Sequence, residues 1–374
     1  MGNPYLYSIP KSLKVFQAVN SNLEIINNSQ MHDQGAIIGS YASNVTVSDM
    51  NIYETTIDTP AFTIVTSNLT LSNCQIYSMS SSNESPLINV NEGSGLNMNN
   101  IKFYDSNLNL LESADSQTVV SYVEIFNITN ITSIMKFSNL TDCVVEHCKL
   151  MDIESSSSNV ILHIESSHIS RLENITFTEI DKIPLYIIQS DVNLVSDLSI
   201  NDCLVGPRLE KSSISNFTNS ELINLGGSSI TKGSGLLLTD SNLTITNVTF
   251  MNNTADEGGS IYFSCPGSDQ CSLTLTKCNF THNIGRLSGG AIQYDVYRPV
   301  MNQNTFEGNS AIYGPNIASY PYEIRLIGSD ESPVELDDVP SGIEGAIIFT
   351  VGVYDQDGQI MSLDNTSLVH VHEL

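Results

Sequence analysis

A six-residue pattern of hydrophobic and polar positions recurs along the chain. Ile245–Phe250 (ITNVTF) and Leu275–Phe280 (LTKCNF) both read apolar, polar, polar, apolar, polar, apolar. The same hexad, in some copies with one substitution, occupies residues 47–52, 71–76, 98–103, 145–150, 172–177, 195–200 and 301–306. Two degraded copies are placed with their ends at Ile128 and Leu225. The copies recur about every 25 residues, and a sustained period of this length indicates a repeat architecture.

Each hexad predicts two short strands joined by a bend. Apolar and polar residues alternate within a strand, and two consecutive polar residues break that alternation. Asn and Asp tolerate the left-handed backbone that a tight bend requires. They stand at the bend in Asp49, Asn73, Asn100, Asn174, Asp197 and Asn247. Stacked copies bury a face that one copy cannot bury alone, so the sequence predicts an all-β, parallel β-helix of about eleven coils, ~50 Å long.

The last apolar residue of each hexad is expected to point into the β-helix. The expected stack consists of Ile52, Ile76, Phe103, Leu150, Phe177, Ile200, Phe250, Phe280 and Phe306. A leucine-rich repeat is the rival, because L-x-x-L-x-L-x-x-N also fits Ile245–Asn253. The strand before the bend has no place in that repeat, and the intervening segments lack helical periodicity. The β-helix is therefore the better interpretation.

A sharper signature begins at about residue 234. Phe-x-x-Asn is followed by a glycine turn in Phe250–Asn253 with Gly258 and Gly259, in Phe280–Asn283 with Gly289 and Gly290, and in Phe306–Asn309 with Gly314. This pairing resembles the repeat of chlamydial-type polymorphic outer-membrane proteins and that of large β-helix surface proteins of ciliated protists. The segment Tyr313–Pro321 looks like the end of the β-helix in the ciliate-type proteins. The resemblance implies a secreted or surface-displayed protein of adhesive or structural type, with no enzymatic activity attached to the motif.

The same motif has a physical interpretation. The aromatic ring fills the tube, and Asn253, Asn283 and Asn309 stand at matching turns, where amide side chains form hydrogen-bonded ladders. The glycine pairs allow turns too tight for a side chain. These are structural roles.

Three regions are predicted along the chain. Residues 1–30 are a lead-in or cap, residues 31–322 form the parallel β-helix, and residues 323–374 form a β segment of an incomplete β-sandwich. The C-terminal segment contains Asp355-Gln-Asp-Gly358. A hairpin turn fits this stretch better than a calcium loop, because the other ligands of such a loop are missing.

Composition narrows the classes of partner. Acidic side chains number 41 against 14 basic ones, a net charge of −27, although only 15% of residues are charged. Nucleic acid and anionic membranes need a dense Lys/Arg footprint, so neither is an expected partner. No apolar run is long enough to insert into a bilayer. No cofactor is predicted, and weak calcium binding by the acidic surface is the exception left open.

The cysteines divide into two groups. Cys74, Cys148 and Cys278 occupy the apolar fourth place of the hexad, which predicts buried core thiols. Cys265 and Cys271 flank a polar loop, and a local disulfide is the expected pairing. Zinc is disfavoured there because no second Cys or His pair lies nearby in the sequence.

Asn-x-Ser/Thr occurs fourteen times, eleven times ending in Thr. The eleven are Asn44, Asn68, Asn127, Asn130, Asn139, Asn174, Asn216, Asn242, Asn247, Asn252 and Asn279. Use of these asparagines as glycosylation acceptors predicts an extracellular or cell-surface protein of the secretory pathway, with its signal or anchor outside this chain. The alternative is that Asn-apolar-Thr recurs only because this residue pattern suits the strands of the repeat.

Parallel β-helices also include pectate lyases and galacturonan hydrolases, which need clustered acidic groups or bound calcium. No such cluster is evident in the sequence. His147, His163, His168 and His282 share no coil position with carboxylates, which favours structural roles. We therefore expect a non-enzymatic module that presents a repetitive, glycosylated surface to surface or matrix proteins or glycans, in a larger assembly. The alternative is a polysaccharide lyase or glycoside hydrolase.

Overall fold

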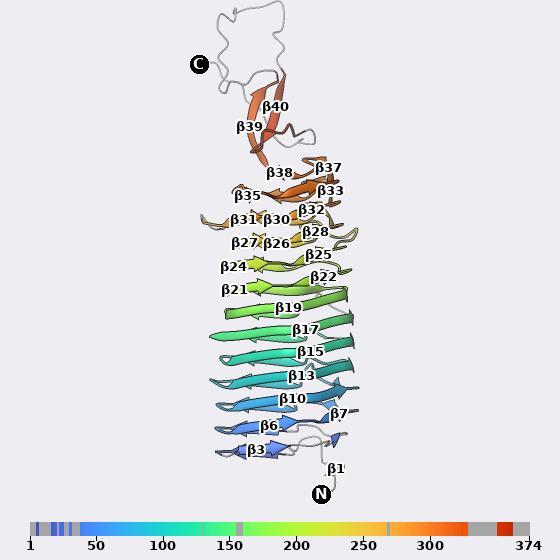
Figure 1. Ribbon diagram of the computed structural model, residues 1–374, viewed down its shortest axis with the longest axis vertical. Coiled ribbons are helices and arrows are strands. Elements are labelled where there is room, and N and C mark those ends of the chain that lie inside the picture. The colour runs from blue at the N-terminus through green and yellow to red at the C-terminus, as the bar shows by residue number, and fades with distance from the viewer. Residues whose placement is uncertain are drawn as a thin grey trace, which may run out of the picture.

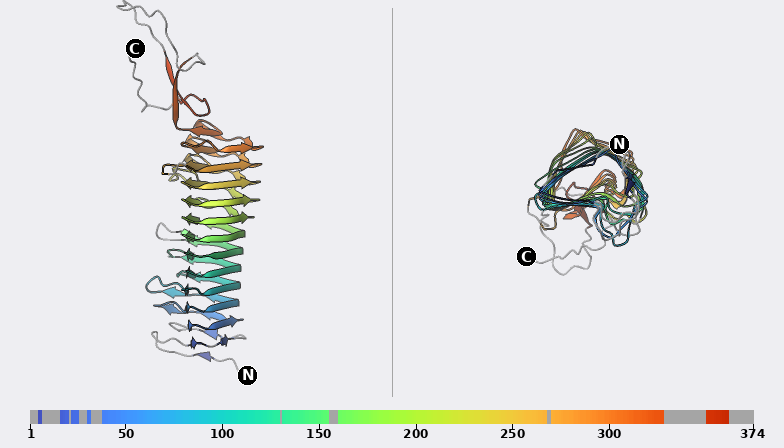
Figure 2. Two further views of the ribbon diagram at one scale, coloured as in Figure 1. Left: turned by 90° about the vertical axis from the view of Figure 1, so that its left-hand side faces the viewer. Right: turned by 90° about the horizontal axis from the view of Figure 1, so that it is seen from below.

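The strands stack one above another into a rod with the chain winding along its axis (Figure 1). The computed structural model describes residues 5–6, 16–20, 22–25, 30–31, 38–129, 131–154, 160–267, 270–327 and 350–361. Within these ranges the secondary structure is strand and turn, with no helix. Seen along the axis, successive coils superimpose as one closed tube (Figure 2). The predicted parallel β-helix is confirmed.

Two parallel sheets form most of the tube. The 20-stranded sheet contains β1 (Tyr5–Leu6), β3 (Asn22–Ile25), β4 (Gln30–Met31), β6 (Asn44–Ser48), β7 (Asn51–Tyr53), β10 (Asn68–Tyr77), β13 (Gly95–Ser106), β15 (Gln117–Thr129), β17 (Asp142–Glu154), β19 (His168–Ile180), β21 (Asp191–Ser196), β22 (Ser199–Asn201), β24 (Ser213–Thr218), β25 (Glu221–Ile223), β27 (Asn242–Thr246), β28 (Thr249–Met251), β31 (Ser272–Thr276), β32 (Asn279–Thr281), β35 (Val300–Asn302) and β36 (Thr305–Glu307). The 13-stranded sheet contains β2 (Phe16–Val19), β5 (Ile38–Tyr41), β9 (Phe62–Val65), β12 (Ile88–Asn91), β14 (Leu111–Ala114), β16 (Met135–Ser138), β18 (Val160–Glu165), β20 (Ile183–Ile188), β23 (Arg208–Glu210), β26 (Leu236–Thr239), β30 (Ile261–Ser264), β34 (Ile292–Tyr294) and β38 (Ile317–Ser319).

Smaller sheets complete the described fold. A parallel three-stranded sheet joins β29 (Thr254–Glu257), β33 (Ile284–Ser288) and β37 (Ser310–Tyr313). A parallel pair joins β8 (Thr56–Ile57) and β11 (Ser80–Ser81). An antiparallel pair joins β39 (Pro321–Leu326) and β40 (Val351–Asp355).

The bend of the hexad is a single left-handed residue. Asp49, Asn73, Asn100, Asn174, Asp197 and Asn247 have φ between 52° and 57°. Tyr122, His147, Lys277 and Gln303 adopt the same conformation with φ of 54° to 55°. The fold therefore imposes this backbone even where the residue does not favour it.

The stack residues lie inside the tube. Ile52, Ile76, Phe103, Leu150, Phe177, Ile200, Phe250 and Phe280 are at most 1% exposed. Phe306 is half-buried and packs against the core. Among the described strands its own strand, β36, has a neighbour only in β32, so one side of the ring is uncovered. The Phe280 ring stacks on Phe250 and on Phe306, with centroids 4.9 Å apart in both pairs.

The two degraded copies end three residues earlier than predicted. Ile125 pairs in register with Phe103 and Leu150, and Leu222 pairs with Ile200 and Phe250. Ile128 and Leu225, which the sequence indicated, each follow a second left-handed residue, Asn127 or Asn224. Both are also buried. Burial alone therefore did not distinguish them from the true stack positions.

Buried amides and hydroxyls hold the turns together. The Asn253 and Asn283 side chains are fully buried, and each accepts from the backbone N–H of the preceding coil: Leu225 N–H to Asn253 at 3.0 Å and Asn253 N–H to Asn283 at 3.0 Å. Asn309 continues the ladder, accepting from Asn283 N–H at 2.9 Å. Each Asn amide also donates to a carbonyl one coil back.

The glycine turns have no room for a side chain. A Cβ on Gly259 would lie 2.2 Å from the Gly290 carbonyl oxygen, and one on Gly290 would lie 2.0 Å from that of Pro315. Gly258 and Gly289 have φ of 63° and 59°. The predicted roles of both glycine pairs agree with this geometry.

A second ladder, of serine, lies at the turn before the 20-stranded sheet. Ser43 N–H donates to Ser67 Oγ at 3.1 Å, Ser167 N–H to Ser190 Oγ at 3.0 Å, and Ser190 N–H to Ser212 Oγ at 3.2 Å. These serines are buried. The ladder explains why Ser so often stands directly before a strand of this sheet.

The described ends of the β-helix differ. Near the N-terminus, β1, β2 and β3 already pair in parallel with β4, β5 and β6. Near the C-terminus, the turn at Asp355–Gly358 lies against the last coils. The buried Asp355 carboxylate accepts from Tyr313 and from Ser319 N–H, and Asp357 accepts from Tyr294 at 2.7 Å. This stretch is a hairpin turn, while the predicted boundaries at residues 31 and 323 stay predictions.

Candidate functional site

A groove of about 280 Å³ crosses the outer face of four consecutive strands, β13, β15, β17 and β19. These strands lie in the middle of the rod (Figure 1). The groove is lined by Asn100, Ile101, Lys102, Tyr122, Glu124, His147, Lys149, Asn174 and Thr176. We call it the axial groove.

The bend positions its first column of side chains. Asn100, Tyr122, His147 and Asn174 are the left-handed residues of their coils, with φ of 52° to 54°. The kink turns their side chains away from the core. Chemically different residues therefore occupy one line along the rod.

Strand alternation positions the second column. The residues two positions beyond the bend pair in register on successive strands and point outward. They are Lys102, Glu124, Lys149 and Thr176. Neighbouring strands in a sheet are about 4.8 Å apart, so each column repeats at that step along the axis.

Direct contacts link side chains within each column. The Tyr122 and His147 rings stack with centroids 4.6 Å apart. The Asn174 amide lies 2.7 Å from His147 Nδ1, so a neutral His147 that accepts there carries its proton on Nε2. In the second column, Lys102 Nζ lies 2.9 Å from Glu124 Oε2. Among the described residues, no carboxylate lies within ion-pair distance of Lys149.

This arrangement favours binding over proton transfer. Tyr122 is 54% exposed, and Lys102 and Lys149 are also exposed, so water reaches the groove freely. The hydrogen bond to Glu124 raises the pKa of Lys102, which holds it as a cation and makes it a poorer base. Amide, phenol, imidazole and ammonium groups together suit a ligand rich in hydroxyl groups.

An aromatic row lies next to the axial groove. Tyr53, Tyr77, Tyr104 and Phe126 stack along the axis with centroids 5.2, 5.1 and 4.9 Å apart and planes within 11° of parallel. Each ring covers the face of its neighbour. The row is therefore a ladder that supports the coils, and the Tyr77 and Tyr104 rings, covered on both faces, offer no open platform for sugar stacking.

The Asn-x-Thr sites lie at the surface. Asn44, Asn68, Asn127, Asn139, Asn174, Asn216, Asn242, Asn247, Asn252 and Asn279 are all exposed. Asn130 lies outside the described residues. Asn44 and Asn68 stand on adjacent coils, with the Asn68 amide donating to Asn44 Oδ1 at 2.9 Å. Exposure is what a glycan acceptor requires, and occupancy stays a prediction.

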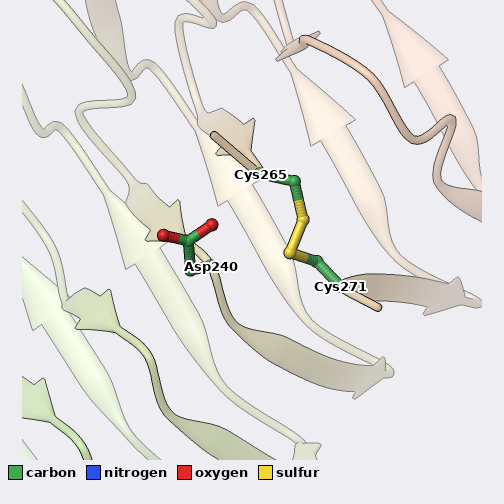
Figure 3. Close-up of side chains that lie close together, drawn as sticks. All are labelled: Asp240, Cys265 and Cys271. Carbon is green, nitrogen blue, oxygen red and sulfur yellow. A yellow bond between two sulfur atoms is a disulfide. The ribbon is translucent and has the colours of Figure 1, made fainter. Parts of the chain in front are cut away.

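Cys265 and Cys271 form a disulfide. Figure 3 shows the Asp240 carboxylate beside it, and Asp240 Oδ1 accepts from Gly267 N–H at 2.9 Å. The ligand atoms of these three side chains lie within 4.8 Å of one another. Metal binding would need free thiolates, and the two sulfurs are bonded to each other. The carboxylate therefore fastens the loop that the disulfide closes.

The other five cysteines are buried in the core. Burial raises the pKa of Cys74 to about 11, of Cys148 to about 12 and of Cys203 to about 11. It also raises the pKa of Cys143 and Cys278. Such thiols stay protonated and unreactive, in line with the structural role predicted for Cys74, Cys148 and Cys278.

The axial groove was not predicted from the sequence. No carboxylate was expected near His147, yet Glu124 lines the same groove. The signal was available, because Val120–Ile125 (VSYVEI) fits the hexad with Tyr122 at the bend. Placing that copy three residues late moved Tyr122 and Glu124 out of register with Lys102 and Lys149.

Comparisons with known proteins agree with the fold. Residues 136–311 match the family described as right handed beta helix region. No curated protein matches the chain. Two similar solved structures are a PL6 alginate lyase in complex with a trisaccharide, at TM-score 0.36, and alginate lyase AlyF-OU02 with G6, at TM-score 0.32. Each is 12% identical, and the alignment covers 84% of both chains.

The chain is thus a parallel β-helix protein. The similarity to the two lyases is too distant to carry an argument about activity. Among the described residues there is also no helix that is long and apolar enough to span a bilayer.

Proposed function

We propose that this protein is a non-enzymatic, extracellular β-helix that binds an extended neutral glycan along the axial groove. The supporting observation is the groove itself, in which two columns of outward polar side chains run in register over four strands. A polymer lying along the rod meets donors and acceptors from the same two columns at every step. Many weak contacts of this kind add up without an enclosed pocket.

Charge favours a neutral ligand. The chain carries a net charge of −27, which repels polyanions at long range. Inside the groove, the Lys102–Glu124 pair cancels its own charge, and Lys149 is the remaining cation. Hydroxyl groups both donate and accept, and they match the mixture of Asn, Tyr, His and Thr side chains there.

Two features support the proposed extracellular location. The ten described Asn-x-Thr asparagines are exposed, and Cys265 and Cys271 are joined. Disulfides persist in oxidising compartments. Display on a cell surface or within an extracellular assembly of proteins and glycans follows as part of the same proposal.

Affinity electrophoresis through gels containing xylan, glucomannan or mixed-linkage β-glucan tests the binding. Tyr122→Asn and His147→Asn place in the groove the residue that the fold already uses at Asn100 and Asn174, so we expect both variants to fold. We expect retardation by at least one of these glycans and about tenfold weaker binding in the double variant, a loss of about 1.4 kcal/mol. Tyr41→Gln, which removes a tyrosine 55% exposed on the other sheet, is the matched control. Equal retardation of all three proteins would refute the groove as the binding site.

A carbohydrate-active enzyme is the second candidate. The observation that favours it is the convergence of Lys102, Glu124, His147 and Lys149 on one groove. These are groups that act as acids, bases and carboxylate-binding cations. Turnover of a polysaccharide that disappears in Lys149→Met or His147→Asn would establish this candidate and remove the first.

A further inference from the structure

A second groove, of about 460 Å³, lies on the outer face of the 13-stranded sheet. We call it the Arg208 groove. Strands β20, β23 and β26 form its floor, and residues 229–232 form one wall. Its apolar lining includes the half-buried Ile183, Ile230 and Leu237.

Arg208 is the unusual group in this groove. Burial lowers the pKa of its guanidinium to about 10, so Arg208 is still a cation at neutral pH but has lost part of its hydration. Its one described hydrogen bond goes to the Lys232 carbonyl at 3.1 Å. Within the described part of the chain, no carboxylate pairs with it. The half-buried guanidinium therefore has donors available for an incoming anion.

The other charged groups of the groove are already engaged. Glu210 Oε2 accepts from Tyr186 at 2.8 Å, and Glu210 Oε1 lies 3.9 Å from Lys211 Nζ. Lys232 Nζ lies 2.7 Å from the Tyr262 hydroxyl and 3.9 Å from Glu257. Arg208 is therefore the group best placed to take an incoming negative charge.

The wall over the groove is preformed. Arg286 pairs with Asp256 at 2.6 Å and donates to the carbonyls of Ile230 at 2.6 Å and Gly227 at 3.1 Å. These bonds fix the segment that faces Arg208. A ligand entering the groove does not have to order this segment, which lowers the entropic cost of binding.

We propose that the Arg208 groove binds a small organic anion with an apolar body, its carboxylate or sulfonate paired with Arg208 and its body against Ile183, Ile230 and Leu237. The volume lies within the range of about 300–1,000 Å³ typical of small-molecule sites. A guanidinium donates two parallel hydrogen bonds to such an anion, and the apolar walls make that pairing stronger than in water. This site is independent of the glycan proposed for the axial groove.

Anilinonaphthalene sulfonate, which combines an aromatic body with a sulfonate and fluoresces on binding, is the probe. We expect a saturable site in the intact protein and at least tenfold weaker binding in Arg208→Met. Arg171→Met is the matched control, because Arg171 is exposed on the other sheet and pairs with Glu146 at 2.6 Å. Unchanged binding in Arg208→Met, or equal weakening in both variants, would overturn the proposal.

Two further measurements separate this site from a general apolar surface. Leu237→Glu introduces a like charge beside the bound anion and should abolish the saturable signal while the circular dichroism stays that of the β-helix. Hexanoate should displace the probe, whereas hexanol at the same concentration should not. Retained binding in Leu237→Glu, or equal displacement by both competitors, would show that the anion does not pair with Arg208.

Discussion

The left-handed bend is the smallest unit that repeats in this molecule. Where it is Asn, the side chain also reaches the neighbouring coil: Asn100 donates to Asn73 at 2.8 Å and Asn247 donates to Asn219 at 2.8 Å. At some bend residues no such contact to the neighbouring coil is described, and the backbone strain remains without that compensation. Lys277, with φ of 54°, is such a position above Asn247.

Lys277→Asn should therefore stabilise the protein. A left-handed backbone costs most L-residues about 1–2 kcal/mol, and Asn tolerates it better. We expect the free energy of unfolding in urea to rise by about 1 kcal/mol. Lys149→Asn is the control, since Lys149 lies in a strand and should give no gain. A loss of stability in Lys277→Asn would contradict this account of the bend.

Buried thiols give the protein a defined response to high pH. The pKa of Cys148 rises from its ordinary value of 9.0 to about 12 because burial disfavours the thiolate. Below pH 9 the thiol is neutral in both states and its contribution to stability is complete. As pH rises from 9 towards 12, the unfolded chain loses the proton and the folded chain keeps it, so stability falls by about 1.4 kcal/mol per pH unit for this group.

Cys148→Val tests that response. The variant should lose less stability than the parent protein between pH 9 and 11, and both should behave alike between pH 6 and 8. The comparison uses urea unfolding at each pH. If the free energy of unfolding fell equally with pH in both proteins over the whole range, burial would not be raising the pKa of Cys148.

At the scale of the strand, the interior is held by rings stacked from coil to coil. Phe280 on β32 is fully buried between Phe250 and Phe306. Phe280→Ala should lower the free energy of unfolding by about 3–5 kcal/mol, the range for emptying a packed aromatic site. Phe306→Ala should cost clearly less, because Phe306 is half-buried on β36, which has β32 as its only neighbour among the described strands. Equal costs would mean that position in the stack does not determine stability.

The elements were predictable from sequence because the β-helix repeats one physical constraint. Each coil must place apolar residues inside and bend at a fixed point, and this constraint produces the hexad that identifies Phe250 and Phe280. The constraint on sequence is weaker for side chains that point outward. The sequence did not group Tyr122, His147 and Lys149, because their proximity depends on the register between coils and the copy at Ile125 was placed three residues late. Arg208 meets Lys232 through residues 226–232, which pair with β29 of the next coil but carry no hexad pattern that would have placed them.

At the scale of the whole molecule, the outer surface should be glycosylated. The exposed asparagines lie along the rod, and Asn44 and Asn68 are too close on adjacent coils for both to carry a glycan. Treatment of protein from its native source with an N-glycosidase should reduce its mass, and peptide mapping should find sugar on at most one of these two residues. An unchanged mass would remove the main support for the extracellular proposal.

The central claim is that the rod binds along its surface and performs no chemistry there. The most direct measurement incubates the purified protein with the retarding neutral glycan and, separately, with polygalacturonate with and without calcium. Reducing ends and unsaturated products are followed in the samples used for binding. The account predicts retention of the neutral glycan that falls about tenfold in the Tyr122→Asn, His147→Asn double variant, with no product from any substrate. Product formation that is lost in Lys149→Met or His147→Asn would contradict it and make the axial groove an active site.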